Sequence, residues 1–276
     1  MPLVSKVTRK YLRTKKQFPN VWCAGCGIGT VMGAIIRAID KLQLPQDEVV
    51  MVSGIGCSSR MPVYVDFNTL HTTHGRPLAF ATGVKLAKPH LKVIIITGDG
   101  DALAIGGNHF IHACRRNIDL TVILVNNFTY GMTGGQVAPT TPFMKYGTTA
   151  PYGNRERGFD IAKLAIAAGA PFVARGTVYH VVQLQKLIEQ GIQKTGFALV
   201  EVISHCHVLY GRLNKEGGAI EMLKWQREHA IPIRAAGKVP PEKLRDKFLT
   251  GVLWDIEFPE YCEEYEKVIA QAQGKI

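Results

Sequence analysis

The sequence lacks any apolar run long enough to cross a bilayer. Its longest candidates, residues 93–97 and 120–125, have the length of buried strands, well short of the roughly 18–20 residues that a spanning helix needs. The basic N-terminus is not followed by the apolar segment of a secretory signal. We therefore expect a cytoplasmic protein that does not enter the membrane.

Acidic residues are absent from residues 1–16, which contain six Lys and Arg, whereas residues 255–266 contain six acids and no base. The formal net charge is +11, and a basic surface can attract nucleic acid, an anionic cofactor or an acidic protein. However, the sequence also lacks interleaved aromatic and basic residues and any recognition-helix or RNA-binding signature. Nucleic acid is therefore not the expected partner, and a solvated basic tail is the simplest alternative.

Internal repeats and low-complexity tracts are absent as well. The 276 residues, 46% of them hydrophobic and 20% charged, suit one large globular domain with an appendage. We divide the chain into a basic N-terminal segment (1–20), a cofactor-binding domain (21–215) and a C-terminal extension (216–276) that we expect to be helical and that contains no readable motif.

Helices and strands are predicted to alternate along the central domain. Residues 92–97 form an unbroken apolar, β-branched run, which is typical of a parallel strand buried on both faces. This alternation predicts an α/β fold with a doubly wound, mostly parallel sheet. Residues 131–152 are rich in Gly, Pro and Thr and predict a functional loop. The other predicted strands are 48–53, 120–126, 172–174 and 197–204, and the predicted helices begin after Cys26 and span 76–88, 104–116, 160–168 and 179–195.

Gly98-Asp99-Gly100-Asp101 follows the most clearly predicted strand, and Asn126-Asn127 follows the next one. Ligands in open α/β sheets bind at the carboxyl ends of strands, where glycines and a helix N-terminus admit a phosphate. A carboxylate there would repel a diphosphate unless a cation such as Mg²⁺ lay between them. The ordered combination resembles the thiamine diphosphate fingerprint. By that resemblance Asp99, the Asn127 side chain and the Thr129 carbonyl oxygen bind Mg²⁺.

The six cysteines include a C-x-x-C pair, Cys23 and Cys26, with Cys57 following 31 residues later. Such a set is able to hold zinc or an iron–sulfur cluster, or to act as a thioredoxin-like redox pair. The fourth ligand must then be Cys114, Cys206 or Cys262. Cys114 has the spacing of a core residue and Cys262 lies in the acidic tail, so we choose Cys206, which follows the last predicted strand.

Together these patterns resemble the β subunit of the 2-oxoacid:ferredoxin oxidoreductases. The resemblance runs from about Trp22 to Cys206 and includes residues 54–60, 71–76, 98–109 and 126–136. It implies that Cys23, Cys26, Cys57 and Cys206 hold a [4Fe–4S] cluster. It also implies that thiamine diphosphate contacts Gly56, Cys57, Ser58, His74, Gly98, Asp99, Gly100, Asp101, Asn127, Tyr130, Gly131, Met132 and Thr133.

The same resemblance has consequences for partners. The activating glutamate is expected on an α subunit that contains the pyrimidine-binding domain, so no catalytic residue is assigned to this chain. Ferredoxin is expected to accept the electrons, coenzyme A to accept the acyl group, and an (αβ)₂ assembly to form.

The substrate is expected to be a 2-oxoacid. Positions matching Arg60 and Met132 line the oxoacid pocket in the family, and His71 and Arg76 are further candidates. The run at residues 64–76 resembles the 2-oxoglutarate branch, but some broad-specificity relatives have Lys where this chain has Gly134. Pyruvate or a branched 2-oxoacid is the first alternative. A non-oxidative thiamine diphosphate decarboxylase with structural zinc is the second, and a nucleic-acid-binding module is the third.

Overall fold

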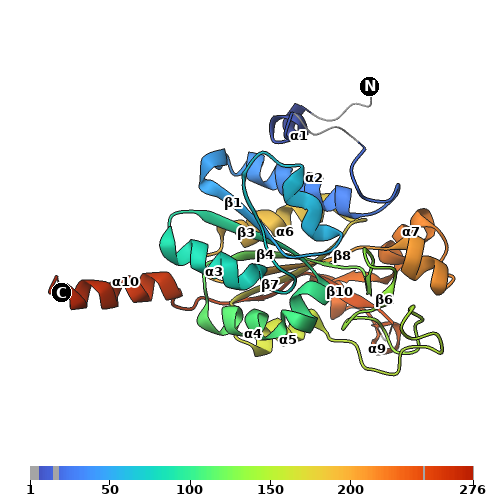
Figure 1. Cartoon of the computed structure of the whole chain (residues 1–276). Helices are drawn as coiled ribbons and strands as arrows, with labels where there is room; N and C mark the ends of the chain where they lie inside the picture. Colours follow the sequence, from blue (N-terminus) through green and yellow to red (C-terminus); the bar gives the residue numbers. More distant parts are fainter. Residues whose placement is uncertain (1–5, 15–18, 245, 276) are drawn as a thin grey trace.

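The computed structural model describes residues 6–14, 19–244 and 246–275. Lys15 and Lys16 of the basic N-terminal segment therefore lie outside the described residues. Figure 1 shows a central twisted sheet with helices on both faces. The eight strands follow the order β2 (Asn68–His71), β1 (Val49–Ser53), β3 (Lys92–Gly98), β4 (Thr121–Asn126), β8 (Ala198–Ile203), β7 (Phe172–Thr177), β10 (Phe248–Asp255) and β9 (Ala230–Pro232).

The central strands are parallel and buried on both faces, as their apolar composition predicts. The helices are α1 (Lys6–Lys10), α2 (Ile28–Lys41), α3 (Pro77–Ala87), α4 (Gly107–Arg116), α5 (Ile161–Ala167), α6 (Val181–Gln193), α7 (Ala219–His229), α8 (Ile233–Ala236), α9 (Pro241–Leu244) and α10 (Tyr261–Ala272). One core contains Ile94 and Ile96 and lies under α2 and α6. The other contains Ile95 and lies under α3, α4 and α5. The α/β, doubly wound prediction is confirmed.

Three local predictions need correction. The strand Asn68–His71 was not predicted, because it is a partly exposed edge strand without a long apolar run. The expected helix at 104–116 begins at Gly107, after a separate π-helical turn at Asp101–Ile105. The long loop includes a two-stranded hairpin formed by β5 (Thr129–Tyr130) and β6 (Gln136–Val137). Short 3₁₀ turns occupy Gln46–Glu48 and Ser58–Val63, and a second π turn occupies His207–Gly211.

The C-terminal extension is not wholly helical, which corrects the expectation for residues 216–276. Its strand β10 pairs antiparallel with β7 and extends the main sheet, while β9 pairs with β10. These two strands were not predicted, because neither contains a long unbroken apolar run and most of their side chains are only partly buried. Beyond β10, helix α10 projects away from the body (Figure 1).

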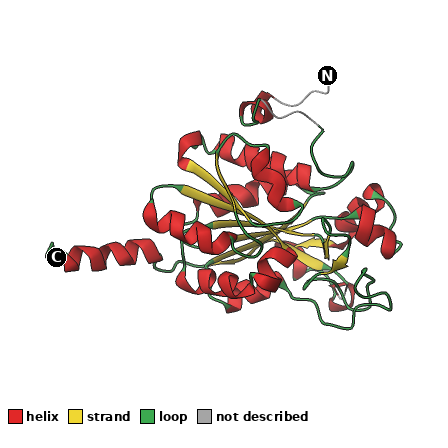
Figure 2. Ribbon diagram, viewed as in Figure 1, coloured by secondary structure: helices red, strands yellow, loops and turns green. Residues whose placement is uncertain are grey.

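The carboxyl ends of β1, β3, β4 and β8 meet at one edge of the sheet, because these strands are parallel and adjacent (Figure 2). That edge therefore receives the segments after Ser53, Gly98, Asn126 and Ile203. No helix in the described part of the chain is long and apolar enough to cross a membrane.

Candidate cofactor and metal site

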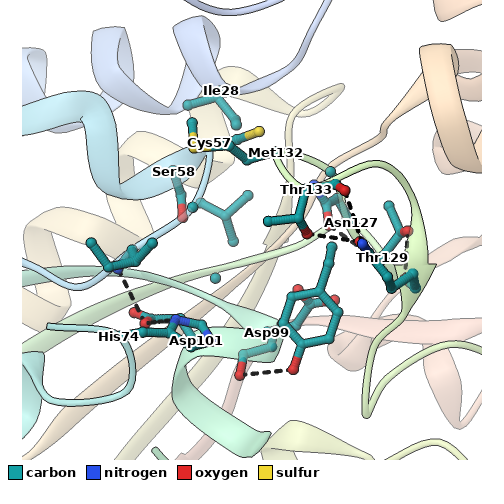
Figure 3. A pocket seen from close by; sticks show the side chains of 18 residues that line it. Ile28, Cys57, Ser58, His74, Asp99, Asp101, Asn127, Thr129, Met132 and Thr133 are labelled. Carbon is teal, nitrogen blue, oxygen red and sulfur yellow. Dashed lines mark hydrogen bonds and ion pairs between the residues drawn. The ribbon is translucent and has the colours of Figure 1, made fainter. Parts of the chain in front are cut away.

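A pocket of about 450 Å³ opens at the carboxyl ends of β1, β3 and β4. All thirteen residues predicted to contact the cofactor line it, as does Thr129, and Figure 3 shows how they surround the cavity. Sequence reasoning missed four further lining residues: Ile28, Ile55, Val125 and Gln136. Three of these are apolar and therefore carry no polar signal, whereas Gln136 lies within one of the motifs that carried the family resemblance.

Asp99 lies at the floor of this pocket and is 3% exposed. Its Oδ1 accepts from the Gly100 N–H at 2.9 Å, and its Oδ2 accepts from Thr140 Oγ1 at 2.5 Å. Burial raises the pKa of Asp99 to about 6, although these hydrogen bonds oppose the shift. A divalent cation beside it would favour the ionised form. The buried carboxylate therefore fits a magnesium site.

Asn127 and Thr129 flank a tight turn beside Asp99. Phe128 between them has φ +63°, a left-handed conformation that non-glycine residues seldom adopt. Asn127 Oδ1 accepts from the Thr129 N–H at 3.4 Å. The Phe128 carbonyl accepts from Thr141 Oγ1 at 2.7 Å, which anchors the turn to the long loop. One carboxylate, one amide oxygen and one carbonyl form an oxygen-donor set of the kind that Mg²⁺ prefers.

Glycines form the part of the wall where a phosphate would lie. A methyl group at Gly100 would lie 2.2 Å from the Tyr130 ring, so a larger residue would displace that ring. Gly98 and Gly56 line the same wall, and Gly56 has φ +121°. Gly100 therefore makes room for the Tyr130 ring, whereas the open backbone at Gly56 and Gly98 fits a diphosphate that approaches the helical turn starting at Asp101.

Asp101 also lines the pocket, but its oxygens bind the surrounding loops. Oδ1 accepts from the Gly75 N–H at 2.7 Å and the Ile55 N–H at 3.2 Å, and His74 Nδ1 lies 2.8 Å away. Oδ2 accepts from Thr97 Oγ1 at 2.7 Å. Asp101 therefore joins the loops after β1 and β2 to β3, and it positions His74 at the pocket wall.

The four predicted cluster cysteines lie next to this pocket. A methyl group at Gly131 would lie 3.4 Å from the Cys57 sulfur and 3.7 Å from the Cys206 sulfur. Trp22 Nε1 donates to the Cys57 carbonyl at 2.7 Å, which holds the C-x-x-C loop against the Cys57 loop. Burial raises the pKa of Cys26 to about 11 and that of Cys57 to about 12, and neighbouring thiols, Cys206 among them, add to both shifts. Cys114 and Cys262 are buried elsewhere.

The described residues bring no three His, Cys, Asp or Glu side chains together at distances that suit a single metal ion. A four-iron cluster instead binds each thiolate to a different iron and holds the sulfurs farther apart. Beside Cys206, Ser204 Oγ and His207 Nδ1 are buried without a hydrogen-bond partner in the described parts of the chain. Buried polar atoms normally have partners, so these two and the four-thiol donor set fit a cluster.

The four residues predicted to bind the substrate do not all lie in this pocket. Met132 lines the pocket and is 46% exposed. Arg60, His71 and Arg76 do not line it. His71 Nδ1 lies 2.8 Å from Ser53 Oγ, and Arg76 donates to the Ile105 carbonyl at 3.2 Å. Their role in substrate binding stays a prediction.

Comparison with known proteins gives a consistent result. A family model described as "Thiamine pyrophosphate enzyme, C-terminal TPP binding domain" matches residues 54–202. The 2-oxoglutarate synthase subunit KorB of Methanocaldococcus jannaschii is 52% identical over 266 residues, which cover 96% of this chain and 98% of the relative. The subunit of the same name from Archaeoglobus fulgidus is 51% identical over 258 residues, which cover 94% and 92%.

A solved structure gives the same relationship. The 2-oxoglutarate:ferredoxin oxidoreductase from Magnetococcus marinus, with 2-oxoglutarate, coenzyme A and succinyl-CoA bound, superposes with a TM-score of 0.85 at 31% identity. The match covers 98% of this chain and 91% of that chain. The pocket at the strand ends, the neighbouring cysteines and these relatives agree, and the chain therefore belongs to the family of 2-oxoacid:ferredoxin oxidoreductase β subunits, with the thiamine pyrophosphate-binding domain of that superfamily.

Proposed function

We propose that this chain is the β subunit of a CoA-acylating 2-oxoglutarate:ferredoxin oxidoreductase. Asp99, Asn127 and the Thr129 carbonyl would hold Mg²⁺, and Cys23, Cys26, Cys57 and Cys206 would hold a [4Fe–4S] cluster. The contacts of Gly131 are the observation that carries this proposal. Gly131 lines the pocket and lies against the sulfurs of Cys57 and Cys206, so a cofactor and a cluster bound here would be neighbours.

Each group on this chain has a defined task in that reaction. Asp99 and Asn127 would hold the cation that neutralises a diphosphate, and Gly56 and Gly98 would let the diphosphate approach the backbone. Ile28, Ile55 and Met132 give the pocket part of its apolar lining. When bound, thiamine pyrophosphate supplies an electron sink for decarboxylation of a 2-oxoacid, and an iron–sulfur cluster supplies a one-electron acceptor.

A partner subunit would complete the site. The carboxylates that line the pocket, Asp99 and Asp101, are both engaged in the contacts described above. An activating carboxylate for the aminopyrimidine would therefore come from an α subunit, within an (αβ)₂ assembly that passes electrons to ferredoxin.

The substrate proposal rests on the relatives. Those from M. jannaschii and A. fulgidus are named 2-oxoglutarate synthase subunits, and the M. marinus structure contains 2-oxoglutarate and coenzyme A. We propose the same substrates here, with Arg60 and Met132 on the oxoacid side. Pyruvate remains the alternative, and the ratio of kcat/KM values for 2-oxoglutarate and pyruvate decides between them.

The test uses anaerobically purified chain, alone and with its co-expressed α subunit. We expect about four irons per chain, a brown colour, and CoA-dependent reduction of a viologen dye only when both subunits are present. Asp99→Asn should lose Mg²⁺-dependent cofactor binding and retain iron. Turnover by the isolated chain would contradict the partner requirement, and stoichiometric zinc without iron would favour a non-oxidative decarboxylase.

A further inference from the structure

The strands behind the pocket contain a buried ion pair that the proposed chemistry does not use. Arg175 on β7 and Glu201 on β8 are register partners, and Arg175 Nε donates to Glu201 Oε2 at 2.7 Å. Glu201 is 1% exposed and Arg175 is 9% exposed. Such pairs cost desolvation, and apolar residues commonly replace them without loss of stability. Stability alone therefore does not account for this pair.

The second oxygen of Glu201 fixes the orientation of Asn126. Asn126 Nδ2 donates to Glu201 Oε1 at 3.0 Å, and Asn126 Oδ1 accepts from the Phe128 N–H at 3.3 Å. Rotating the amide by half a turn would place its oxygen against the Glu201 carboxylate and its NH₂ group against the Phe128 N–H. Both contacts would then be repulsive, so Glu201 selects one orientation of Asn126.

The backbone conformation of Phe128 sets the positions of the two candidate Mg²⁺ ligands next to it, the Asn127 side chain and the Thr129 carbonyl. The left-handed backbone of Phe128, with φ +63°, is strained for a non-glycine residue and must be held by its surroundings. The hydrogen bond from Phe128 to Asn126 therefore acts on the turn that joins Asn127 to Thr129.

Arg175 connects the same network to the start of helix α5. Its Nη2 donates to Asp160 Oδ1 at 2.8 Å, and Asp160 is the N-cap of that helix. Burial disfavours the charged guanidinium, but Glu201 and Asp160 outweigh it and leave the pKa of Arg175 raised. A continuous series of contacts thus runs from Asp160 through Arg175, Glu201 and Asn126 to Phe128.

We propose that Arg175 and Glu201 are positioning residues for the magnesium site, and that they act through Asn126 to hold the Asn127–Thr129 turn in its ligand-presenting conformation. This role rests on the proposed function, because it presupposes that Asn127 and the Thr129 carbonyl bind Mg²⁺. Neither charged side chain contacts the cation in this role.

The test measures the Mg²⁺ dissociation constant by titration calorimetry on the complex with its α subunit, with thiamine diphosphate in excess. The double substitution Arg175→Met with Glu201→Leu removes both charges and leaves no buried ion unpaired. We expect the dissociation constant to rise roughly 10- to 100-fold, the range for residues that orient metal ligands. The Tm measured without Mg²⁺ should stay within a few degrees of wild type.

A double-mutant cycle tests whether the effect passes through Asn126. In the Asn126→Ala background, the double substitution at Arg175 and Glu201 should change the Mg²⁺ dissociation constant by less than about twofold. Glu201→Gln is a second, near-isosteric variant, for use if the double substitution does not fold. It should also raise the Mg²⁺ dissociation constant.

The matched control is Lys85→Met with Asp119→Asn. Lys85 is 3% exposed and pairs with Asp119, which precedes β4 at the opposite end of the strands. This control should keep the wild-type Mg²⁺ affinity. Saturable wild-type binding that is unchanged in the Arg175 and Glu201 variants would overturn the positioning role alone. A wild-type complex without saturable Mg²⁺ binding would overturn the magnesium site and this role together.

Discussion

The six cysteines of this chain lie in different environments. Cys57 lines the cofactor pocket, and Cys206 lies beside it across Gly131. Cys114 lies on α4 and is fully buried in one core of the sheet, whereas Cys57 packs against the other core. The distinction matters because a thiol becomes a metal ligand only where other donors converge on it.

Cys206→Ser should therefore differ from Cys114→Ser. We expect Cys206→Ser to lose most of the iron and the visible absorbance of the cluster, because one of four thiolate ligands is removed. The control, Cys114→Ser, should keep iron and colour. Iron analysis and absorbance spectra of anaerobically purified variants measure this, and full iron content in Cys206→Ser would contradict the assignment of the fourth ligand.

The ion pair between Asp160 and Arg175 should make part of the folding stability depend on pH. Burial alone would raise its pKa, but Arg175 outweighs burial and leaves the pKa lowered from 3.8. A lowered pKa means that the ionised carboxylate stabilises the fold above its unfolded pKa, and that this stabilisation is lost as the pH falls through the folded pKa.

Asp160→Asn should accordingly lower the free energy of unfolding at neutral pH and have progressively less effect in acid. Asn keeps the helix cap, so the substitution isolates the charge. We expect a loss below about 1 kcal/mol, since the side chain is 38% exposed and water screens the pair. Urea unfolding at a series of pH values checks this, and a loss that does not depend on pH would be inconsistent with the pair.

At the scale of elements, β10 decides how the C-terminal region is attached. It covers the edge of β7, whose backbone groups would otherwise be unpaired and prone to aggregation. The segment after β10 is also fixed, because Asn117 Nδ2 donates to the carbonyls of Phe258 and Pro259 and the Asp119 N–H donates to Glu260. Helix α10 extends beyond these contacts.

Truncations at two positions should therefore behave differently. A chain that ends at residue 262 removes most of α10 and should keep a cooperative thermal transition close to that of wild type. A chain that ends at residue 247 removes β10 and should aggregate or lose the transition. Circular dichroism melts and size-exclusion chromatography distinguish them, and a stable chain ending at 247 would show that residues 248–262 are dispensable.

At the scale of the whole molecule, the net charge should affect how fast a charged redox partner associates with the chain. The net charge of +11 would steer an acidic ferredoxin toward the chain, and such steering weakens as salt screens the charges. We expect kcat/KM for ferredoxin to fall several-fold between about 0.05 and 0.3 M NaCl. Viologen reduction at the same salt concentrations is the control and should change little. Equal salt dependence of both reactions would argue against steering.

Much of the site could be predicted from short stretches of sequence. Gly98-Asp99-Gly100 and Asn127 follow strands whose apolar runs are unmistakable, and parallel strands place their carboxyl ends together. Thr140 was not predicted to contact Asp99, because a threonine in a long loop has no periodic signal. The pairing of Arg175 with Glu201 was also not predicted, since it depends on the register of two strands that are far apart in sequence.

Local composition and the geometry of parallel sheets were enough to predict which central strands are buried, that they are parallel, and which polar residues follow their ends. Three features are found only in the folded chain: the contact of Gly131 with the sulfurs of Cys57 and Cys206 at the pocket wall, the addition of β10 to the sheet, and the series of contacts from Asp160 to the turn at Phe128. These contacts join distant segments through packing, register and backbone conformation, which no local pattern specifies.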